Sequence, residues 1–597
     1  METIVGIDLG TTNSAISVIQ DGRPIMLKMA DGQAVLPSVV GLNSDGQLLV
    51  GQAARNQLVL APERTIKSVK RKMGQDVKLT LGAQQYTPAE ISAIILRALK
   101  EQAERVLGHP VRKAVITVPA FFNETQREAT RAAGDLADLE VVRIINEPTA
   151  ATLVYEPKSE RNERLLIYDL GGGTFDVSVV QIEQGVIEVL SSHGDTQLGG
   201  DDFDELLLTW VCEHFLDEHD LDLRELATAK SRLLQAVEES KKRLSFEAYT
   251  ELAEEFIAEK DGLPLNLQMT LERRDFEELI EPLMNKTVRC VDEALSDAGL
   301  QAAQIDKVIM VGGSSRIPLV HHMLQHQLKQ PPHFEIDPDL CVAMGAAIQG
   351  GLIAGHDVGS VLVDITPHTL GIECLGNLHG SMSPHLFSPI IERNTPLPAT
   401  RSDIYYTAVD GQDKAEIHVL QGEEEDARHN HSIGKFVLEG MDENAPRGAE
   451  VLVRFELNLD GMLIVTAVER ATSREKRLTI KNAVSQFRAT SRDEAKAKLA
   501  SMFTTIDDSE HLILPVDAAG EPPIETPADA ELQAAIAQAR ELIAKSNKLA
   551  EAAGGEDADE IRELTAQLET AITRQSQDEI SEISEQLEDV VFYLEDA

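Results

Sequence analysis

The chain has 597 residues, which is too long for a single hydrophobic core, so we expect two to four domains. Its net charge of −45 argues against binding nucleic acid or an anionic membrane through bulk electrostatics. The four cysteines show no CxxC spacing, which argues against structural zinc and a disulfide framework and fits a reducing compartment. The sequence shows no signal-peptide pattern and no apolar run of membrane-spanning length, so we expect a cytoplasmic protein.

The first predicted element has a near copy far downstream. Residues 7–12 (IDLGTT) and 168–174 (YDLGGGT) each combine an apolar run, an Asp and a Gly/Thr turn, and more apolar residues follow. This pattern predicts a strand, a tight turn and a second strand. Glycine lets the backbone bring several N–H groups close to a ligand, and each Asp can hold a hydrated Mg²⁺. Two such turns indicate two related half-domains that face each other across a nucleotide.

The rest of residues 1–357 alternates strand-like and helical patterns, which is typical of an α/β domain. No GxxxxGK[ST] motif is present, so phosphate binding must rest on the two hairpins. A third glycine pair, Gly312 and Gly313, could pack against a base and ribose, although a GGS turn alone is more often structural. We predict buried strands at 115–118, 165–168 and 308–311, and helices at 88–107 and 227–244.

The pattern changes after the loose composition at 355–359 and a short apolar segment at 361–364. As far as about residue 485, apolar and polar residues alternate, and DG pairs separate the runs, which predicts a compact β-sandwich. Residues 485–597 are helical in pattern and acidic, with 26 Asp and Glu against 9 Lys and Arg. A proline-rich loop is expected at about 507–529. The three amphipathic helices after it are typical of a small bundle, and a partner-binding helix is the alternative.

Five motifs follow one another along the chain: GIDLGTTNS at 6–14, IINEPTAA at 144–151, DLGGGTFDV at 169–177, VGGSSRIP at 311–318 and HVLQGE at 418–423. In this colinear order they resemble the seventy-kilodalton heat-shock chaperones of the DnaK type. The match runs from residue 3 to about 485, and the short, divergent C-terminal region is most similar to the HscC-like bacterial branch.

The resemblance implies an ATP-dependent chaperone that binds extended apolar segments of unfolded proteins. Its affinity for them would be switched by ATP binding and hydrolysis through an interdomain linker. The implied architecture is multidomain: an actin-like α/β two-lobed ATPase domain at 1–357, the linker at 358–366, a β-sandwich substrate-binding domain at 367–485 and a helical lid at 486–597.

The same resemblance implies hydrolysis of ATP to ADP and phosphate with Mg²⁺, and with K⁺ as a further candidate ion. Asp8 and Asp169 would hold Mg²⁺ mainly through waters. Without the family, Lys70 is one surface lysine among several. The catalytic set would be Lys70, Glu147, Asp169, Thr174 and Asp176. The nucleotide would be bound by Gly10, Thr11, Thr12, Gly171, Gly172, Gly173, Gly200, Glu238, Lys241, Ser245, Gly312, Gly313, Ser314, Arg316 and Asp339.

A peptide channel is also implied, although alternating apolar residues in a sandwich normally face the core. Leu375 and Ala408 are smaller or plainer than a Met-bearing arch, and Ala415 stands where a larger β-branched residue is usual. The family's peptide preference therefore does not carry over directly. The channel residues would be Ile372, Cys374, Leu375, Tyr405, Ala408, Ala415 and Ile417.

Coupling would run through the linker, which contains Leu362 and Asp364. Ser360 replaces an apolar residue of the usual linker, a change expected to weaken linker docking. The proline-rich loop interrupts the lid region, so we expect faster peptide exchange than in a full-lidded relative. A nucleotide exchange factor is a further candidate partner. Pro119, Arg127 and Arg131 match a relay from the nucleotide, and Arg143 and Asp364 match the surface that J-domain cochaperones engage.

Two other functions are compatible with this nucleotide fold. A sugar or small-molecule kinase would need an acceptor pocket with a catalytic base, and it leaves the β and helical regions unexplained. A non-catalytic binding protein or filament former would only hold ATP. The joint presence of Lys70, Glu147, Asp169, Thr174 and Asp176 argues against that loss of hydrolysis.

Overall fold

The computed structural model describes two compact units, residues 1–512 and 513–597. The described residues in the first unit are 2–155, 162–183, 185–333, 337–356, 361–459, 461–470, 475–480, 495–499 and 502–503. In the second unit, only ten helical positions between 539 and 587 are described. Ala539, Leu568 and Leu587 are among them and are buried, in agreement with the apolar faces expected of the amphipathic helices. The predicted loop at 507–529 lies outside the described residues.

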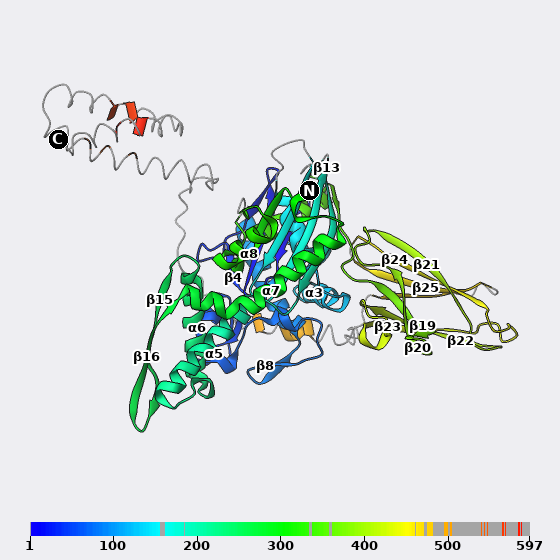
Figure 1. Cartoon of the computed structure of the whole chain (residues 1–597), viewed down its shortest axis with the longest axis horizontal. Helices are drawn as coiled ribbons and strands as arrows, with labels where there is room; N and C mark the ends of the chain where they lie inside the picture. The colour runs from blue at the N-terminus through cyan, green and yellow to red at the C-terminus, as the bar shows by residue number, and fades with distance from the viewer. Residues whose placement is uncertain are drawn as a thin grey trace. The chain divides into compact units, whose positions relative to one another are not determined.

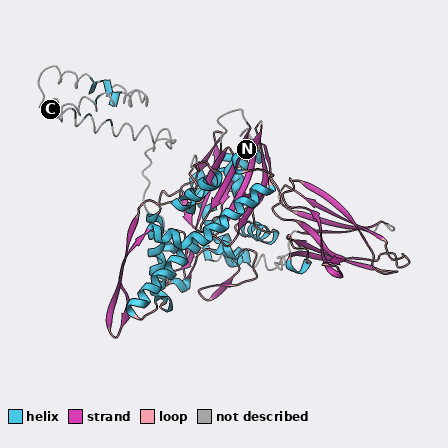
Figure 2. Ribbon diagram, viewed as in Figure 1, coloured by secondary structure: helices cyan, strands magenta, loops and turns pink. Residues whose placement is uncertain are grey.

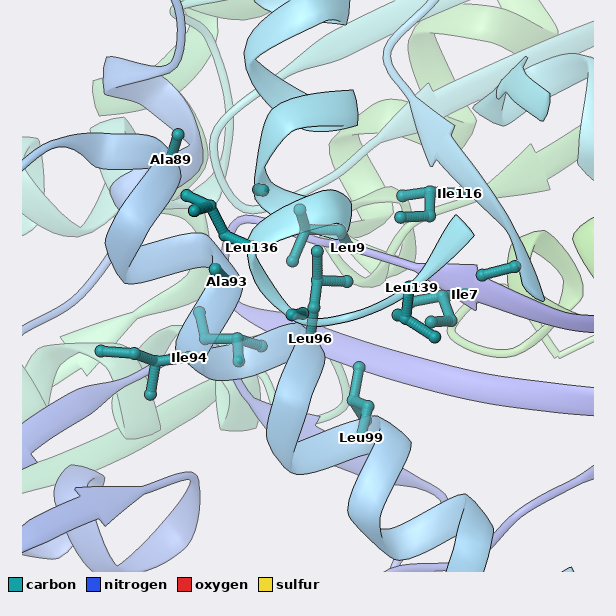
Figure 3. Packing of buried hydrophobic residues seen from close by; sticks show 14 of the residues in the cluster. Ile7, Leu9, Ala89, Ala93, Ile94, Leu96, Leu99, Ile116, Leu136 and Leu139 are labelled. Carbon is teal, nitrogen blue, oxygen red and sulfur yellow. The ribbon is translucent and has the colours of Figure 1, made fainter. Parts of the chain in front are cut away.

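The first lobe is built on a sheet of order β11-β10-β1-β2-β3, in which β4 also pairs with β2. β1 pairs parallel with β10 and antiparallel with β2, so the first predicted hairpin is confirmed. Helices α2 and α3 cover the sheet and pack Leu96, Leu99 and Leu136 against Ile7 and Ile116 (Figure 3). The bounds are β1 (Ile4–Asp8), β2 (Asn13–Gln20), β3 (Arg23–Met26), β4 (Val35–Pro37), β10 (Lys113–Val118), β11 (Glu140–Asn146), α2 (Pro88–Leu107) and α3 (Glu124–Leu136).

The second lobe repeats this plan with a sheet of order β17-β12-β13-β14-β18. β12 pairs antiparallel with β13 and parallel with β17, as β1 does with β2 and β10. The predicted strands at 165–168 and 308–311 are therefore confirmed. The bounds are β12 (Glu163–Leu170), β13 (Phe175–Glu183), β14 (Val186–Asp195), β17 (Lys307–Val311), β18 (Val361–Val363), α5 (Gly200–His219), α6 (Ala227–Leu244), α7 (Arg273–Asp297) and α8 (Pro318–Leu328).

Two helices between the sheets join the lobes. α4 (Glu147–Val154) and α9 (Cys341–Ala354) approach so closely that a Cβ at Gly345 would collide with the carbonyl of Ala150. A Cβ at Gly6 of β1 would collide with the α9 backbone. Residues from both sheets and both helices share one buried cluster. The ends of β1 and β12, which carry the predicted aspartates, are thus held by one continuous core.

Smaller elements decorate the lobes, and β15 with β16 forms a long hairpin (Figure 1). Among the described residues, no helix is both long and apolar enough to cross a bilayer. These elements are β5 (Val40–Leu42), β6 (Leu48–Val50), β7 (Thr65–Ile66), β8 (Leu79–Leu81), β9 (Gln84–Tyr86), β15 (Tyr249–Lys260), β16 (Leu263–Glu272), α1 (Gln52–Gln57), η1 (Pro62–Arg64), η2 (Val69–Lys72), η3 (Leu223–Glu225), η4 (Ala302–Gln304) and η5 (Gly313–Arg316).

The described residues between 370 and 480, which we call the β region, form two antiparallel four-stranded sheets around one apolar cluster (Figure 2). Their orders are β20-β19-β22-β23 and β21-β24-β25-β26. Gly411 and Gly461 have positive φ, as the predicted DG turns require. The bounds are β19 (Leu370–Leu378), β20 (Ser381–Ile391), β21 (Ala399–Tyr406), β22 (Lys414–Gln421), η6 (Ala427–His429), β23 (His431–Glu439), β24 (Glu450–Leu457), β25 (Leu463–Glu469) and β26 (Glu475–Ile480).

Two later segments return to the lobes. β18 adds to the second-lobe sheet by pairing parallel with β14, with Leu362 opposite Ile187. Helical residues at 495–499 and 502–503 add Leu499 and Phe503 to the apolar cluster of the first lobe. The Arg97 guanidinium lies over the Phe503 ring at 4.2 Å.

Candidate functional site

The two predicted glycine turns meet face to face. A Cβ on Gly172 would collide with Thr12 Oγ1, and a Cβ on Gly173 would lie 2.6 Å from Thr11 Cγ2. Any residue larger than glycine at either position would therefore push the turns apart. The backbone of Gly199, at the start of α5, packs on Gly172 and Gly173 with equally little room. The fold thus brings two backbone turns from separate lobes into direct contact, as expected for a shared phosphate site.

Charged side chains gather beneath these turns. Asp8 ends β1, and Asp169 and Asp176 flank the second turn on β12 and β13. Lys70 is only 4% exposed and donates to Glu147 Oε1 at 2.5 Å. A lysine in such a place is no longer an ordinary surface residue. The first turn of α4 supplies Glu147, so the helix that joins the lobes also holds the lysine.

Burial and mutual repulsion shape the charges of this cluster. Burial, and then the nearby Glu147, raise the pKa of Asp8 to about 7 and the pKa of Asp176 to about 7, and they also raise the pKa of Asp169. Burial by itself would lower the pKa of Lys70, but Glu147 and Asp8 outweigh it and the net shift is upward. Four carboxylates therefore surround one permanent cation.

The excess of negative charge makes this cluster suited to a further cation. Mg²⁺ keeps several waters and prefers oxygen ligands, so carboxylates that are crowded but not in direct contact with the ion fit it. Within the described part of the chain, no three acidic, His or Cys side chains converge tightly enough to ligate an ion directly. The residues therefore fit Mg²⁺ held through waters and phosphate oxygens, which agrees with the role predicted for Asp8 and Asp169.

Several residues of the predicted nucleotide-binding set converge on the second lobe. On α6, Lys241 donates to the Gly200 carbonyl at 2.9 Å and pairs with Asp204 at 2.8 Å. A Cβ on Gly200 would lie 2.5 Å from Ser314 Oγ of η5. Arg316 pairs with Asp339 at 3.0 Å. Three more residues of the predicted set make contacts here. Glu238 pairs with Arg55 of the first lobe, and Ser245 donates to the Lys241 carbonyl. A Cβ on Gly313 would meet Asp339.

The seven predicted peptide residues differ in exposure. Ile372 and Ile417 are 3% and 4% exposed and belong to the apolar core of the β region. Leu375 is 54% exposed, and Ala408 is exposed as well. Tyr405 donates to Ser388 Oγ at 2.9 Å and thereby ties the two sheets together. Cys374 and Ala415 are half-buried.

Two of the predicted coupling residues, Arg127 and Asp364, lie where the first lobe meets the linker, whereas Leu362 pairs with Ile187 in the second lobe. Arg127 donates to Asn146 Oδ1 at 2.7 Å, and Asn146 Nδ2 donates to the two carboxylate oxygens of Asp364 at 3.1 and 3.0 Å. Burial raises the pKa of Asp364. Arg131 lies one turn further along α3 and donates to the Val141 carbonyl at 3.0 Å. Pro119 is buried after β10, and Arg143 is half-buried on β11.

Sequence reasoning missed several residues that the structure places at these sites. Asn146 sits between Arg127 and Asp364, and His368 contacts the Phe121 carbonyl through Nε2 at 3.1 Å. Ser68 and Arg71 reach across to α5 from either side of Lys70. The sequence pointed to these four residues only through their closeness to Glu147, the linker and Lys70.

A comparison with protein-family models agrees with this geometry. The model described as "Hsp70 protein" matches residues 4–81 and 75–596. These matches include both glycine turns, the lysine and carboxylate cluster, the linker strand and the β region. Since the match covers almost the whole sequence, the chain belongs to the Hsp70 family.

Proposed function

We propose that this chain uses ATP hydrolysis between the two glycine turns to control how tightly the β region holds unfolded polypeptide. Proteins of the Hsp70 family are ATP-dependent chaperones and ATPases. The observation that carries the proposal is the buried Lys70, surrounded by Asp8, Glu147, Asp169 and Asp176 directly beneath two apposed turns. The domain boundaries predicted above, 1–357, 358–366, 367–485 and 486–597, are part of this proposal.

Phosphoryl transfer needs positioning and charge neutralisation more than covalent chemistry. Lys70 is held by Glu147 and would offer its ammonium group to the γ-phosphate. Asp176 is fixed by the Phe121 N–H at 3.0 Å, and with a pKa of about 7 it can accept a proton from an attacking water. Thr174 would add a hydroxyl to the phosphate cradle. Bound Mg²⁺ would neutralise charge on the phosphates.

A short set of contacts leads from this site to the β region. Phe121 donates its N–H to Asp176 and accepts from His368, which follows the linker. Nearby, Arg127 and Asn146 connect the start of α4 to Asp364. ATP can shift the docking of the linker only by binding the docked arrangement more tightly. We propose that these contacts carry that difference in affinity, and that Arg143 and Asp364 face a J-domain cochaperone.

The client would be an extended segment with one central apolar side chain. Burying such a side chain contributes roughly 1.5–3 kcal/mol. Main-chain hydrogen bonds would supply much of the remainder, which suits broad selectivity and an affinity of about 1 μM, near −8 kcal/mol. The exposed Leu375 and Ala408 are the most accessible of the proposed contacts, whereas Ile372 and Ile417 would line the channel only if the core face opens.

Single-turnover ATP hydrolysis, measured with and without an unfolded apolar peptide, tests this proposal. Stimulation by peptide is the expected result. Transfer of phosphate to a metabolite would instead identify a kinase, and bound ATP without turnover would identify a passive ATP-binding protein. The matched peptide control has its central apolar residue replaced by Asp and should give no stimulation.

A further inference from the structure

The turn that carries Lys70 is fastened to the opposite lobe on both sides of the lysine. η2 is a short 3-10 turn, and Ser68 before it has a left-handed backbone with φ of 54°. Ser68 Oγ donates to Asp201 Oδ2 at 2.5 Å, and Arg71 Nη2 donates to both Asp202 oxygens at 2.9 Å. The two aspartates occupy the first turn of α5 in the second lobe. Lys70 is therefore bracketed by two contacts that cross between the lobes.

The same two aspartates are also joined to the second glycine turn. Asp202 Oδ2 accepts from the Gly199 N–H at 2.8 Å, and Asp201 donates its own N–H to the Gly172 carbonyl at 2.7 Å. One short stretch of α5 thus contacts both the backbone that would hold phosphate and the turn that holds the lysine. Movement of one lobe relative to the other would therefore displace the glycine turn and the lysine-bearing turn together.

Arg71 adds a contact of its own at this junction. Its Nη2 also donates to the Gln197 carbonyl at 2.6 Å, and Gln197 Nε2 donates back to the Arg71 carbonyl at 3.1 Å. A Cβ on Gly173 would lie 2.9 Å from Arg71 Cδ, so the arginine stem lies against the glycine turn. Within the described residues, the buried Arg71 Nε has no hydrogen-bond partner. A buried N–H donor without a partner, next to a turn expected to bind phosphate, indicates that an oxygen of a bound ligand accepts its hydrogen bond.

We propose that Ser68, Arg71, Asp201 and Asp202 form an interlobe latch, which positions Lys70 for hydrolysis and slows the release of ADP. Arg71 alone among the four would also touch the nucleotide, by donating from Nε to a phosphate oxygen. The other three are positioning residues, because they act through η2 and the glycine turn. This inference rests on the proposed role of Lys70 and adds a second role for the same turn, retention of the product.

The test uses the full chain with Arg71→Gln, Asp202→Asn and the double variant. Two rate constants are measured: single-turnover ATP hydrolysis, and dissociation of a fluorescent ADP. Each single variant should release ADP about tenfold faster and hydrolyse ATP about tenfold more slowly, because a charge-assisted contact is lost. The double variant should resemble the worse single variant, since both changes remove the same pair. Arg274→Gln is the matched control, because Arg274 is 81% exposed and pairs with Glu278 on the surface of α7.

The outcomes separate this latch from the proposed function. If the wild type does not hydrolyse ATP, the proposed function fails, whatever the variants do. If the wild type is active and Arg71→Gln keeps wild-type rates of release and hydrolysis, the latch is wrong. A merely structural defect would lower the active fraction without changing the two rate constants. If Asp202→Asn fails to fold, Ser68→Ala decides the matter: it removes one hydroxyl and should speed ADP release severalfold, and unchanged release would overturn the latch.

Discussion

Replacing Asp364 by Asn should uncouple the linker from the nucleotide while basal hydrolysis stays near the wild-type rate. The Asp364 carboxylate accepts from Asn146 Nδ2 through both oxygens and from the Ile365 N–H at 2.9 Å. In Asp364→Asn, one acceptor becomes an NH₂ group that faces the Asn146 amide, so two donors are left opposed. Buried polar groups left without partners cost about 1–3 kcal/mol, which would weaken linker docking by about 5- to 150-fold.

The assay is steady-state ATPase activity with saturating unfolded peptide and a J-domain protein, together with protease sensitivity of the linker in ATP. The variant should show little stimulation and a linker that is cleaved even with ATP present. Basal hydrolysis should persist, because Asp364 is not among the carboxylates around Lys70. Asp220→Asn is the matched control, since that side chain is 98% exposed and pairs with Lys260 far from the linker in sequence. Full stimulation of Asp364→Asn would refute the coupling role given to Asp364 and Asn146.

Three further predictions concern charge, pH and packing. Lys70→Ala should lower single-turnover hydrolysis by at least about 100-fold, whereas calorimetry should still detect ATP binding, because the lysine acts mainly on developing charge. Burial lowers the pKa of His368 from 6.5 to about 4, so the docked state binds the histidine proton more weakly than the undocked state does. As the pH falls from 7.5 to 5.5, the undocked histidine gains its proton and docking should weaken about tenfold more in the wild type than in His368→Gln. Burial raises the pKa of Glu124 to about 7 at the same interface, with the opposite effect on docking, but Glu124 is present in both proteins and cancels in the comparison. Gly345→Ala should destabilise the lobes by about 1–3 kcal/mol or more in denaturant unfolding, because the new methyl group meets the Ala150 carbonyl; wild-type stability would show that α4 and α9 can separate.

Local signals in the sequence were sufficient for the elements that present the site. The helix predicted at 88–107 matches α2, because Thr87 and Glu90 form a capping box at its start and Gly108 ends it with a positive φ. The repeated Asp and glycine turns predicted two hairpins, and both are present. These features depend on residues a few positions apart, which periodicity and turn chemistry describe well.

Contacts between distant residues were beyond such reasoning. Lys70 and Glu147 are 77 positions apart, and Asn146 and Asp364 are 218 apart, so no local pattern connects either pair. The alternation of apolar and polar residues along a strand also cannot show whether its apolar face lines the core or a peptide channel. The structure places Ile372 and Ile417 in the apolar core of the β region, where their exposure is only a few per cent.

The junction of β11 and α4 suggests why hydrolysis and docking are sensitive to each other. Asn146 ends the strand and Glu147 begins the helix, so the two are joined by one peptide bond. Glu147 holds Lys70, and Asn146 holds Asp364 and Arg127. A ligand that draws the lysine ammonium away from Glu147 leaves that carboxylate buried and unpaired, which is costly unless the helix start shifts. Because planar peptide geometry transmits such a shift to the neighbouring residue, we expect the γ-phosphate and the docked linker to favour the same position of the first turn of α4.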